Sequence, residues 1–419
     1  MAMKVKVLLS SVLMLSMTWL ASCGGHYHCG TTFGGGSCAG TTTPPSSGNA
    51  NAFAYAVDQN GTMDGYALNT TAATFGPVST YVAPKIATNK GGVGVVVAQG
   101  KYLYAVLQDV QQIYGWSIDS NGNLTALTTG FPLSLPSLSG ISDLSFNQQV
   151  VITNPAGTLM FISDAVGEAI LVYQISNTGA LTAVTGSPFS TSLVSLSPQN
   201  MGMDGLGRFL YVSQVSSTHS GTEVVGYSVS STGANAGALT LIPGSPFNIP
   251  LWEMQGDPSG NYLIGISGRV EFLYGSDDKS LYVYKINQTT GALTAAAGSP
   301  TATVYAPFNI AMQPRSVNGE FVYSFSLNAT GTATNPIEGY KLDPTTGALS
   351  LVAGSPFNIT TPTAFGQFDQ SGSYLFVYSS PASSVRLGVV NVASSGALTE
   401  TLPAATLVTG GYFAASDVP

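Results

Sequence analysis

Apolar and polar residues alternate with a period of two along many short stretches of this chain, as they do in β-strands. Clear examples are LYVYKI at Leu281–Ile286 and ILVYQI at Ile170–Ile175. Strands rich in Tyr or Phe, such as FLYVS at Phe209–Ser213, precede stretches of this kind. Helical periodicity is absent after the first 22 residues. The pattern therefore predicts an all-β protein.

A hairpin phrase recurs along the chain and defines a repeat. It reads GNLT, GALT or GALS and begins at Gly122, Gly179, Gly237, Gly291, Gly347 and Gly396, with copies 49 to 58 residues apart. A weaker copy, TAATF at Thr71, precedes them. A period of this size is typical of propeller blades. The glycine supplies the positive φ of a tight turn between the third and fourth strands of a blade.

Two further turn phrases mark the other strand ends. The first reads NPAG, DGLG, DPSG or DQSG and begins at Asn154, Asp204, Asp257 and Asp369. It predicts a turn between the first and second strands of a blade. Its first residue is expected to form an Asx-type turn and not to act as a catalyst. The second, GSPF or GSPT, follows the fourth strand at Gly186, Gly244, Gly298 and Gly354. We expect its proline to end strand pairing as the chain crosses to the next blade.

The two ends of the repeat region are complementary. NAFAYAV at the start aligns with a second strand, and GYFAASDVP at the end aligns with a first strand. We expect Tyr412–Asp417 to pair beside Phe53–Val57 and to close a ring without a free sheet edge. Second strands begin at Phe53, Tyr102, Leu159, Phe209, Tyr262, Phe321 and Tyr374. Residues 52–419 are therefore predicted to form a seven-bladed β-propeller of four-stranded antiparallel blades, whereas a β-solenoid or two β-sandwiches would not have complementary ends.

Residues 1–22 have the pattern of a lipoprotein signal peptide. Lys4 and Lys6 give a basic start, and the apolar run Val7–Ala21 is too short to span a membrane comfortably. Leu20–Cys23 resembles a lipobox, where a bacterial signal peptidase cuts before a cysteine that bears diacylglycerol. We therefore expect Cys23 to be lipidated and to anchor the mature protein to a membrane of the bacterial cell envelope. An ordinary secretory signal is the alternative.

Residues 23–51 are rich in Gly, Ser and Thr and are expected to form a flexible tether. Cys29 and Cys38 most simply pair as a disulfide in an oxidising compartment. His26 and His28 could instead join them in a zinc site, but the surrounding glycines offer no side chains to orient the ligands. We expect no bound metal there.

Composition and charge limit the possible partners. The chain has 49 Gly and 23 Pro, is 44% hydrophobic and only 8% charged, which suits many short strands and tight turns better than helices. Its formal net charge is −8 and no stretch of it forms a basic patch. A nucleic-acid partner is therefore excluded.

The phrases FLYVS, LYVYKI, TGALT, GSPF and DPSG, repeated in order between Asn51 and Pro419, resemble the lactonase-like seven-bladed β-propeller family, which includes propeller-type 6-phosphogluconolactonase. The resemblance implies that water opens a sugar lactone ring. That reaction needs a base or a metal to activate water and a cation or N–H donor to stabilise the oxyanion. Only His219 of the three histidines lies in the propeller region, which excludes a site built from several histidines.

The candidate site residues lie in loops between second and third strands, which share one face of a propeller with the blade-to-blade crossovers. The longest such loops are Gln214–Thr222, Ser267–Ser280 and Ser326–Pro336. The Ser267–Ser280 loop concentrates charge, with Arg269, Glu271, Asp277, Asp278 and Lys279.

In the functional interpretation of this loop, Arg269 and Lys279 hold an anionic ligand, with Glu271 and His219 as further ligand-binding candidates. Asp277 or Asp278 then acts as the base, or binds a divalent cation weakly, because the spaced oxygen ligands of a calcium loop are missing. The alternative is a solvated loop with surface ion pairs, which contribute only about 0–1 kcal/mol each.

Two functions stay open. One is a membrane-anchored binding module that presents the propeller face to a glycan, a small molecule or an envelope protein, and the scarcity of catalytic groups favours it. The other is a hydrolase of unphosphorylated aldonolactones or related esters, since an exported enzyme would seldom meet a phosphorylated cytosolic lactone. Neither requires a cofactor beyond a weak divalent cation.

Overall fold

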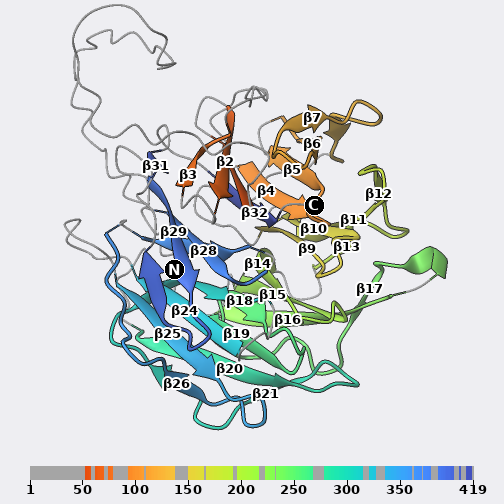
Figure 1. Ribbon diagram of the computed structural model, residues 1–419. Helices are drawn as coiled ribbons and strands as arrows, with labels where there is room; N and C mark the ends of the chain where they lie inside the picture. The colour runs from red at the N-terminus through yellow and green to blue at the C-terminus, as the bar shows by residue number, and fades with distance from the viewer. Residues whose placement is uncertain are drawn as a thin grey trace, which may run out of the picture. The chain divides into compact units, whose positions relative to one another are not determined.

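Seven antiparallel sheets make up the part of the chain that the computed structural model describes (Figure 1). The described residues are 52–57, 62–69, 74–78, 93–107, 110–136, 150–164, 167–191, 196–216, 222–231, 233–267, 278–314, 320–326, 336–360, 363–369, 371–378, 386–400, 405–406 and 412–417. The predicted signal peptide, the tether and the lipidation and disulfide cysteines, Cys23, Cys29 and Cys38, lie outside them.

Each sheet is one blade, and its first four strands follow one another from the channel outward. In blades 2, 3, 5 and 7 a short fifth strand also pairs with the third strand. Blade 1 holds β32 (Tyr412–Asp417), β1 (Ala52–Val57), β2 (Met63–Asn69) and β3 (Thr74–Pro77). Blade 2 holds β4 (Val93–Ala98), β5 (Tyr102–Leu107), β6 (Gln112–Ile118), β7 (Leu124–Ala126) and β8 (Leu133–Ser134). Blade 3 holds β9 (Val151–Thr153), β10 (Leu159–Asp164), β11 (Ala169–Ile175), β12 (Leu181–Ala183) and β13 (Phe189–Ser190). Blade 4 holds β14 (Leu196–Met203), β15 (Phe209–Ser216), β16 (Thr222–Val229) and β17 (Leu239–Leu241).

The remaining blades repeat the same order. Blade 5 holds β18 (Glu253–Gly256), β19 (Tyr262–Ile266), β20 (Ser280–Ile286), β21 (Leu293–Ala295) and β22 (Thr301–Ala302). Blade 6 holds β23 (Pro307–Met312), β24 (Glu320–Ser326), β25 (Ile337–Leu342) and β26 (Leu349–Leu351). Blade 7 holds β27 (Phe365–Phe368), β28 (Tyr374–Tyr378), β29 (Arg386–Val392), β30 (Leu398–Glu400) and β31 (Ala405–Thr406). The helical residues among those described are the 3₁₀ turn at Gly233–Asn235 and Val150, and none of them belongs to a helix able to cross a membrane.

The predicted ring closure is confirmed. Strand β32 pairs antiparallel with β1 over six residues, with Tyr412 opposite Val57 and Asp417 opposite Ala52. In Figure 1 the blue β32 lies among the orange strands from the other end of the chain. The inner strands contact one another in the cyclic order β32, β4, β9, β14, β18, β23, β27 and back to β32. The chain is therefore a seven-bladed β-propeller whose first blade takes its inner strand from the C-terminus.

The hydrophobic core lies between neighbouring blades. Phe209 and Tyr211 of blade 4 pack with Leu263 of blade 5 in one buried cluster. In the same way, Leu68 of blade 1 packs with Phe376 of blade 7, which seals the ring where its two ends meet. Because both faces of each sheet are covered, the second strands read as continuous apolar runs such as FLYV and not as strict alternation.

The proline phrase differs from its prediction. Strand pairing stops at the proline but resumes directly after it on the same blade: Phe189 of β13 lies opposite Ile170 of β11, just as Thr301 of β22 lies opposite Leu281 of β20. The serine of the phrase fills the gap in the ladder, since Ser187 Oγ accepts the N–H of Val172 at 2.9 Å. The crossing to the next blade comes later, because the serine hydroxyl gives the Val172 N–H an acceptor where the strand ladder is interrupted.

Candidate functional site

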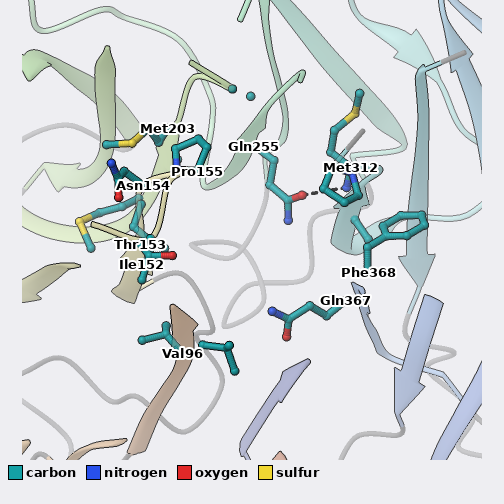
Figure 2. Close-up of a pocket in the computed structure, with 18 of the residues that line it drawn as sticks. Val96, Ile152, Thr153, Asn154, Pro155, Met203, Gln255, Met312, Gln367 and Phe368 are labelled. Atoms are coloured by element: carbon teal, nitrogen blue, oxygen red, sulfur yellow. Dashed lines mark hydrogen bonds between the residues drawn. The ribbon is translucent and has the colours of Figure 1, made fainter. Parts of the chain in front are cut away.

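The described residues enclose a pocket of about 590 Å³ in the central channel (Figure 2). Its wall consists of the inner strands β4, β9, β14, β18, β23 and β27 and of the turns that follow them. Consecutive residues such as Met254, Gln255 and Gly256 all line it. Each inner strand pairs on one side only, with the second strand of its blade. The unpaired backbone edges of the strands therefore form much of the pocket wall.

Glycines let the inner strands of blades 4 and 5 approach closely. A Cβ on Gly202 would lie 2.5 Å from the carbonyl oxygen of Met254, and one on Gly256 would lie 2.3 Å from the carbonyl oxygen of Met203. Both distances are shorter than van der Waals contact, so a side chain at either position would push the strands apart. The two glycines thus set the width of the wall on this side of the pocket.

Gln255 ties β18 to the neighbouring strand β23. Its Nε2 donates to the carbonyl oxygen of Ile310 at 3.0 Å, and its Oε1 accepts the N–H of Met312 at 2.8 Å. The carboxamide thereby forms hydrogen bonds with backbone groups that face the channel. Figure 2 shows this contact at the pocket wall.

A second layer of polar contacts joins the inner strands β18, β23 and β27, next to the layer that contains Gln255. Glu253 Oε1 accepts from Asn309 Nδ2 at 2.7 Å and from the N–H of Ile310 at 3.0 Å. Asn309 Oδ1 in turn accepts the N–H of Gly366 in blade 7 at 3.1 Å. Polar side chains on inner strands therefore satisfy the free edge of the next blade and hold the blades in register.

Gln367 on β27 is different. It is half-buried, lines the pocket, and Figure 2 shows its carboxamide projecting into the open space of the channel. Within the described part of the chain, no hydrogen bond to its side chain is found. A donor and an acceptor on this side chain are therefore available to a ligand.

The pocket wall is electrically neutral apart from one turn residue. Among the described residues that line it, Asp369 is the single ionisable side chain and none is basic. The Asp369 carboxylate accepts the N–H of Tyr374 at 2.9 Å and the hydroxyl of Ser371 at 2.5 Å. The turn role that the sequence predicts for this residue is confirmed, and both of its carboxylate oxygens accept a hydrogen bond within the turn.

Asp204 and Asp257 fill the same turn role in blades 4 and 5. Asp204 Oδ1 accepts the N–H groups of Arg208 and Phe209 at 2.6 and 2.7 Å, and Asp257 Oδ1 accepts the N–H of Tyr262 at 2.6 Å. Both carboxylates are fully buried. Their prediction as turn formers is confirmed.

Glu320 is a buried acid at the interface of blades 5 and 6. Burial raises the pKa of its carboxyl to about 7, and the neighbouring charge of Asp257 and a hydrogen bond to it act in the same direction. Its Oε2 atom has no hydrogen-bond partner among the described residues. Glu320 therefore retains its proton at pH values where a solvated glutamate has lost it.

The predicted loop site is described only in part. Asp278 Oδ2 accepts the hydroxyl of Tyr282 at 2.9 Å and also the hydroxyl of Ser267, and Lys279 is exposed beside it. Burial, with the hydrogen bond to Asp278 next, raises the pKa of Tyr282 to about 12. The other predicted site residues lie outside the described residues, namely His219, Arg269, Glu271 and Asp277.

The two candidate sites belong to opposite ends of the blades. Asp278 precedes the third strand of blade 5, whereas the pocket ends at the turns between first and second strands, such as Pro155 and Pro258. The structure brings Asp278 together with Ser267 and Tyr282 and leaves the predicted catalytic roles untested. Among the described residues, no three His, Cys, Asp or Glu side chains gather where they could share a metal ion.

Sequence reasoning missed the pocket because its wall carries no chemical signature. Gln255 and Gln367 each sit two residues before a turn aspartate, in the phrases QGD and QFD. That shared spacing was the one signal that could have marked them. The spacing does not reveal which of the two glutamines is hydrogen-bonded to a neighbouring strand.

Comparison with known proteins supports the fold. No family model matches the chain, and no curated protein sequence matches it. A crystal structure named "putative 6-phosphogluconolactonase" from Bacteroides fragilis NCTC 9343 aligns with a TM-score of 0.60 and 15% identity over 88% of this chain and 99% of its own. The periplasmic gluconolactonase of Pseudomonas aeruginosa aligns with a TM-score of 0.54 and 14% identity over 88% of this chain and 100% of its own. The chain thus shares the propeller fold of these proteins, as the sequence resemblance indicates.

Proposed function

We propose that this protein is a membrane-anchored binding module of the bacterial cell envelope, in which the channel pocket takes an uncharged small molecule. The pocket itself is the observation that carries this proposal. Its volume of about 590 Å³ is in the range of small-molecule sites, and its wall combines apolar side chains with a few polar groups. The described residues of the wall suit binding better than hydrolysis, because they include no cation for an oxyanion and their one carboxylate, Asp369, already accepts hydrogen bonds in a turn.

A ligand screen by thermal unfolding tests the binding role. A ligand that binds only the folded protein adds RT ln(1 + [L]/Kd) to the free energy of unfolding, so the unfolding temperature keeps rising as the ligand concentration exceeds Kd. The panel should pair neutral sugars and lactones with their phosphorylated or carboxylate counterparts. We expect at least one neutral compound to stabilise the purified full-length protein.

Matched tryptophan variants locate the site. Ala156 is exposed and lines the pocket mouth, so Ala156→Trp should obstruct the channel and abolish the thermal shift. Leu206 occupies the equivalent turn of blade 4, is 55% exposed and does not line the pocket, so Leu206→Trp should leave the shift intact. A shift that survives Ala156→Trp would place the ligand elsewhere and contradict the proposal.

Envelope anchoring rests on the Leu20–Cys23 phrase and has its own test. When cells that express the chain are grown with an alkyne-tagged fatty acid, the protein should become labelled. Cys23→Ser should abolish this label and should also remove the protein from the membrane fraction. Recovery of the Cys23→Ser variant in the membrane fraction would mean that another feature retains the protein there.

Lactone hydrolysis is the second candidate, and the periplasmic gluconolactonase among the structural neighbours favours it. The reaction would require catalytic groups outside the described pocket wall, such as Asp277, Asp278 and Arg269 in the predicted loop site. A hydrolysis assay over a panel of lactones, with and without divalent metal, decides between the two roles. Turnover that falls in Asp277→Ala, Asp278→Ala or Arg269→Ala would establish the hydrolase, whereas turnover unchanged by these substitutions would exclude this loop as its site.

A further inference from the structure

Gln255 and Gln367 occupy equivalent places in blades 5 and 7. Gln255 lies opposite Ile264, the third residue of β19, and Gln367 lies opposite Phe376, the third residue of β28. Both side chains line the pocket. The two carboxamides therefore stand at the same level of the channel, on strands separated by β23 alone.

Their hydrogen bonding differs. Gln255 uses both its amide nitrogen and its amide oxygen to bind two backbone groups of β23, at 3.0 and 2.8 Å. Gln367 makes no hydrogen bond within the described part of the chain, although it is half-buried. A carboxamide that is partly removed from water gains from a partner that offers both an acceptor and a donor. Gln255 is thus part of the wall, whereas Gln367 is free to bind what enters the pocket.

The neutral wall restricts the charge of that partner. An anionic group in the pocket would lose hydration without meeting a cation from the described lining residues, because none of these is basic and their one carboxylate already accepts hydrogen bonds in a turn. Phosphorylated or carboxylate ligands are therefore disfavoured. The exposed backbone edges and the Gln367 carboxamide favour a molecule that carries several hydroxyl groups.

The apolar part of the wall suits the carbon skeleton of such a molecule. Val96, Ile152 and Phe368 line the same space as Gln367 (Figure 2). A sugar ring presents C–H groups on its faces and hydroxyls around its rim, which matches a pocket with both kinds of surface. A cavity of about 590 Å³ accommodates a monosaccharide or a disaccharide.

We propose that Gln367 is the specificity-determining residue of the channel pocket, and that the ligand is an uncharged, hydroxyl-rich molecule of mono- to disaccharide size. This assignment rests on the proposed binding function and names its ligand class. It requires that binding depend on the Gln367 carboxamide and that an added negative charge on the ligand weaken it.

The test is a calorimetric titration of the purified full-length protein. The probes are glucose, cellobiose, maltose and glucono-1,5-lactone, each neutral, beside glucose 6-phosphate and gluconate. The variants are Gln367→Ala and the control Gln112→Ala, which alters a half-buried glutamine of blade 2 outside the pocket lining.

We expect a neutral probe to bind, its charged counterpart to bind about tenfold more weakly, and Gln367→Ala to lower the affinity about fivefold, as the loss of one or two neutral hydrogen bonds does. Gln112→Ala should leave the affinity unchanged.

Each contrary outcome has a distinct meaning. Binding of a neutral probe that is lost in Ala156→Trp but unchanged in Gln367→Ala would overturn the role of Gln367 and leave the binding function standing. Equal or tighter binding of the charged probes would overturn the ligand class. If no neutral probe binds at about 10 mM, the ligand class is wrong, and if no compound of the wider panel binds in the channel, the proposed function fails with it.

Discussion

The hydroxyl of Tyr211 in blade 4 donates a hydrogen bond of 2.7 Å to the carbonyl oxygen of Gly291 in the hairpin of blade 5. The ring of Tyr211 is fully buried. The same contact joins other neighbouring blades, in the pairs Tyr55 with Gly122, Tyr104 with Gly179 and Tyr323 with Gly396, at 2.7 to 2.8 Å. The tyrosine of one blade therefore holds the recurrent glycine hairpin of the next.

Tyr211→Phe should lower the free energy of unfolding by about 1 kcal/mol, because the buried carbonyl of Gly291 loses its hydrogen-bond donor. Chemical denaturation measures the change. Tyr114→Phe is the control, since the Tyr114 hydroxyl donates to Gln112 within its own blade and the side chain is half-buried. An effect no larger than that of the control would show that the contact between blades adds nothing to stability.

Gly291→Ala should destabilise the protein more than Gly298→Ala. Both glycines have positive φ, 75° and 79°, so both substitutions strain the backbone by about 1 kcal/mol. A Cβ on Gly291 would also lie 2.5 Å from Ile242 Cδ1 and 2.6 Å from Phe209 Cδ1, whereas Gly298 has no atom within 4 Å of that position. The crowding should add roughly 2 kcal/mol. Equal unfolding free energies for the two variants would contradict this packing.

Glu320 should make the protein less stable as the pH rises from 5 to 8. Its pKa in the folded protein, about 7, lies above the ordinary value of 4.5, so the native state binds a proton that the unfolded chain has released. The resulting stabilisation is full below pH 4.5 and is lost as the pH rises through 7. In Glu320→Gln, the unfolding temperature should depend less on pH over this interval and should exceed that of the original protein at pH 8. An unchanged pH profile would rule out the elevated pKa.

The two channel glutamines should differ in their effect on stability. Gln255→Ala removes two hydrogen bonds between blades and leaves the backbone groups of Ile310 and Met312 without their partner, which should cost about 1–3 kcal/mol. Gln367→Ala removes no hydrogen bond within the described chain and should change the unfolding free energy by less than about 0.5 kcal/mol. A large loss of stability in Gln367→Ala would mean that this side chain is structural and not a ligand contact.

Much of the propeller follows from local sequence. The second strands begin at or next to their predicted positions, since an apolar run ended by a turn phrase needs no distant information to form a strand. NAFAYAV aligns with a second strand of the repeat and GYFAASDVP with a first strand. This complementarity predicted the pairing of β1 with β32, because only complementary ends close a ring. The resumption of pairing after Ser187-Pro188 was missed, because it depends on a serine hydroxyl bonding to the strand beside it.

The sequence by itself determined the strands, the turn glycines, the turn aspartates and the closure, because each of these depends on neighbouring residues or on the order of repeats. Only the tertiary structure decided that Gln255 is bound to β23 while Gln367 faces the pocket, and that Glu320 lies beside Asp257. These relations join residues of different blades, more than 50 positions apart in the chain. Hydrogen bonds and charge interactions act over a few ångströms, so they arise only when the ring brings neighbouring inner strands into contact.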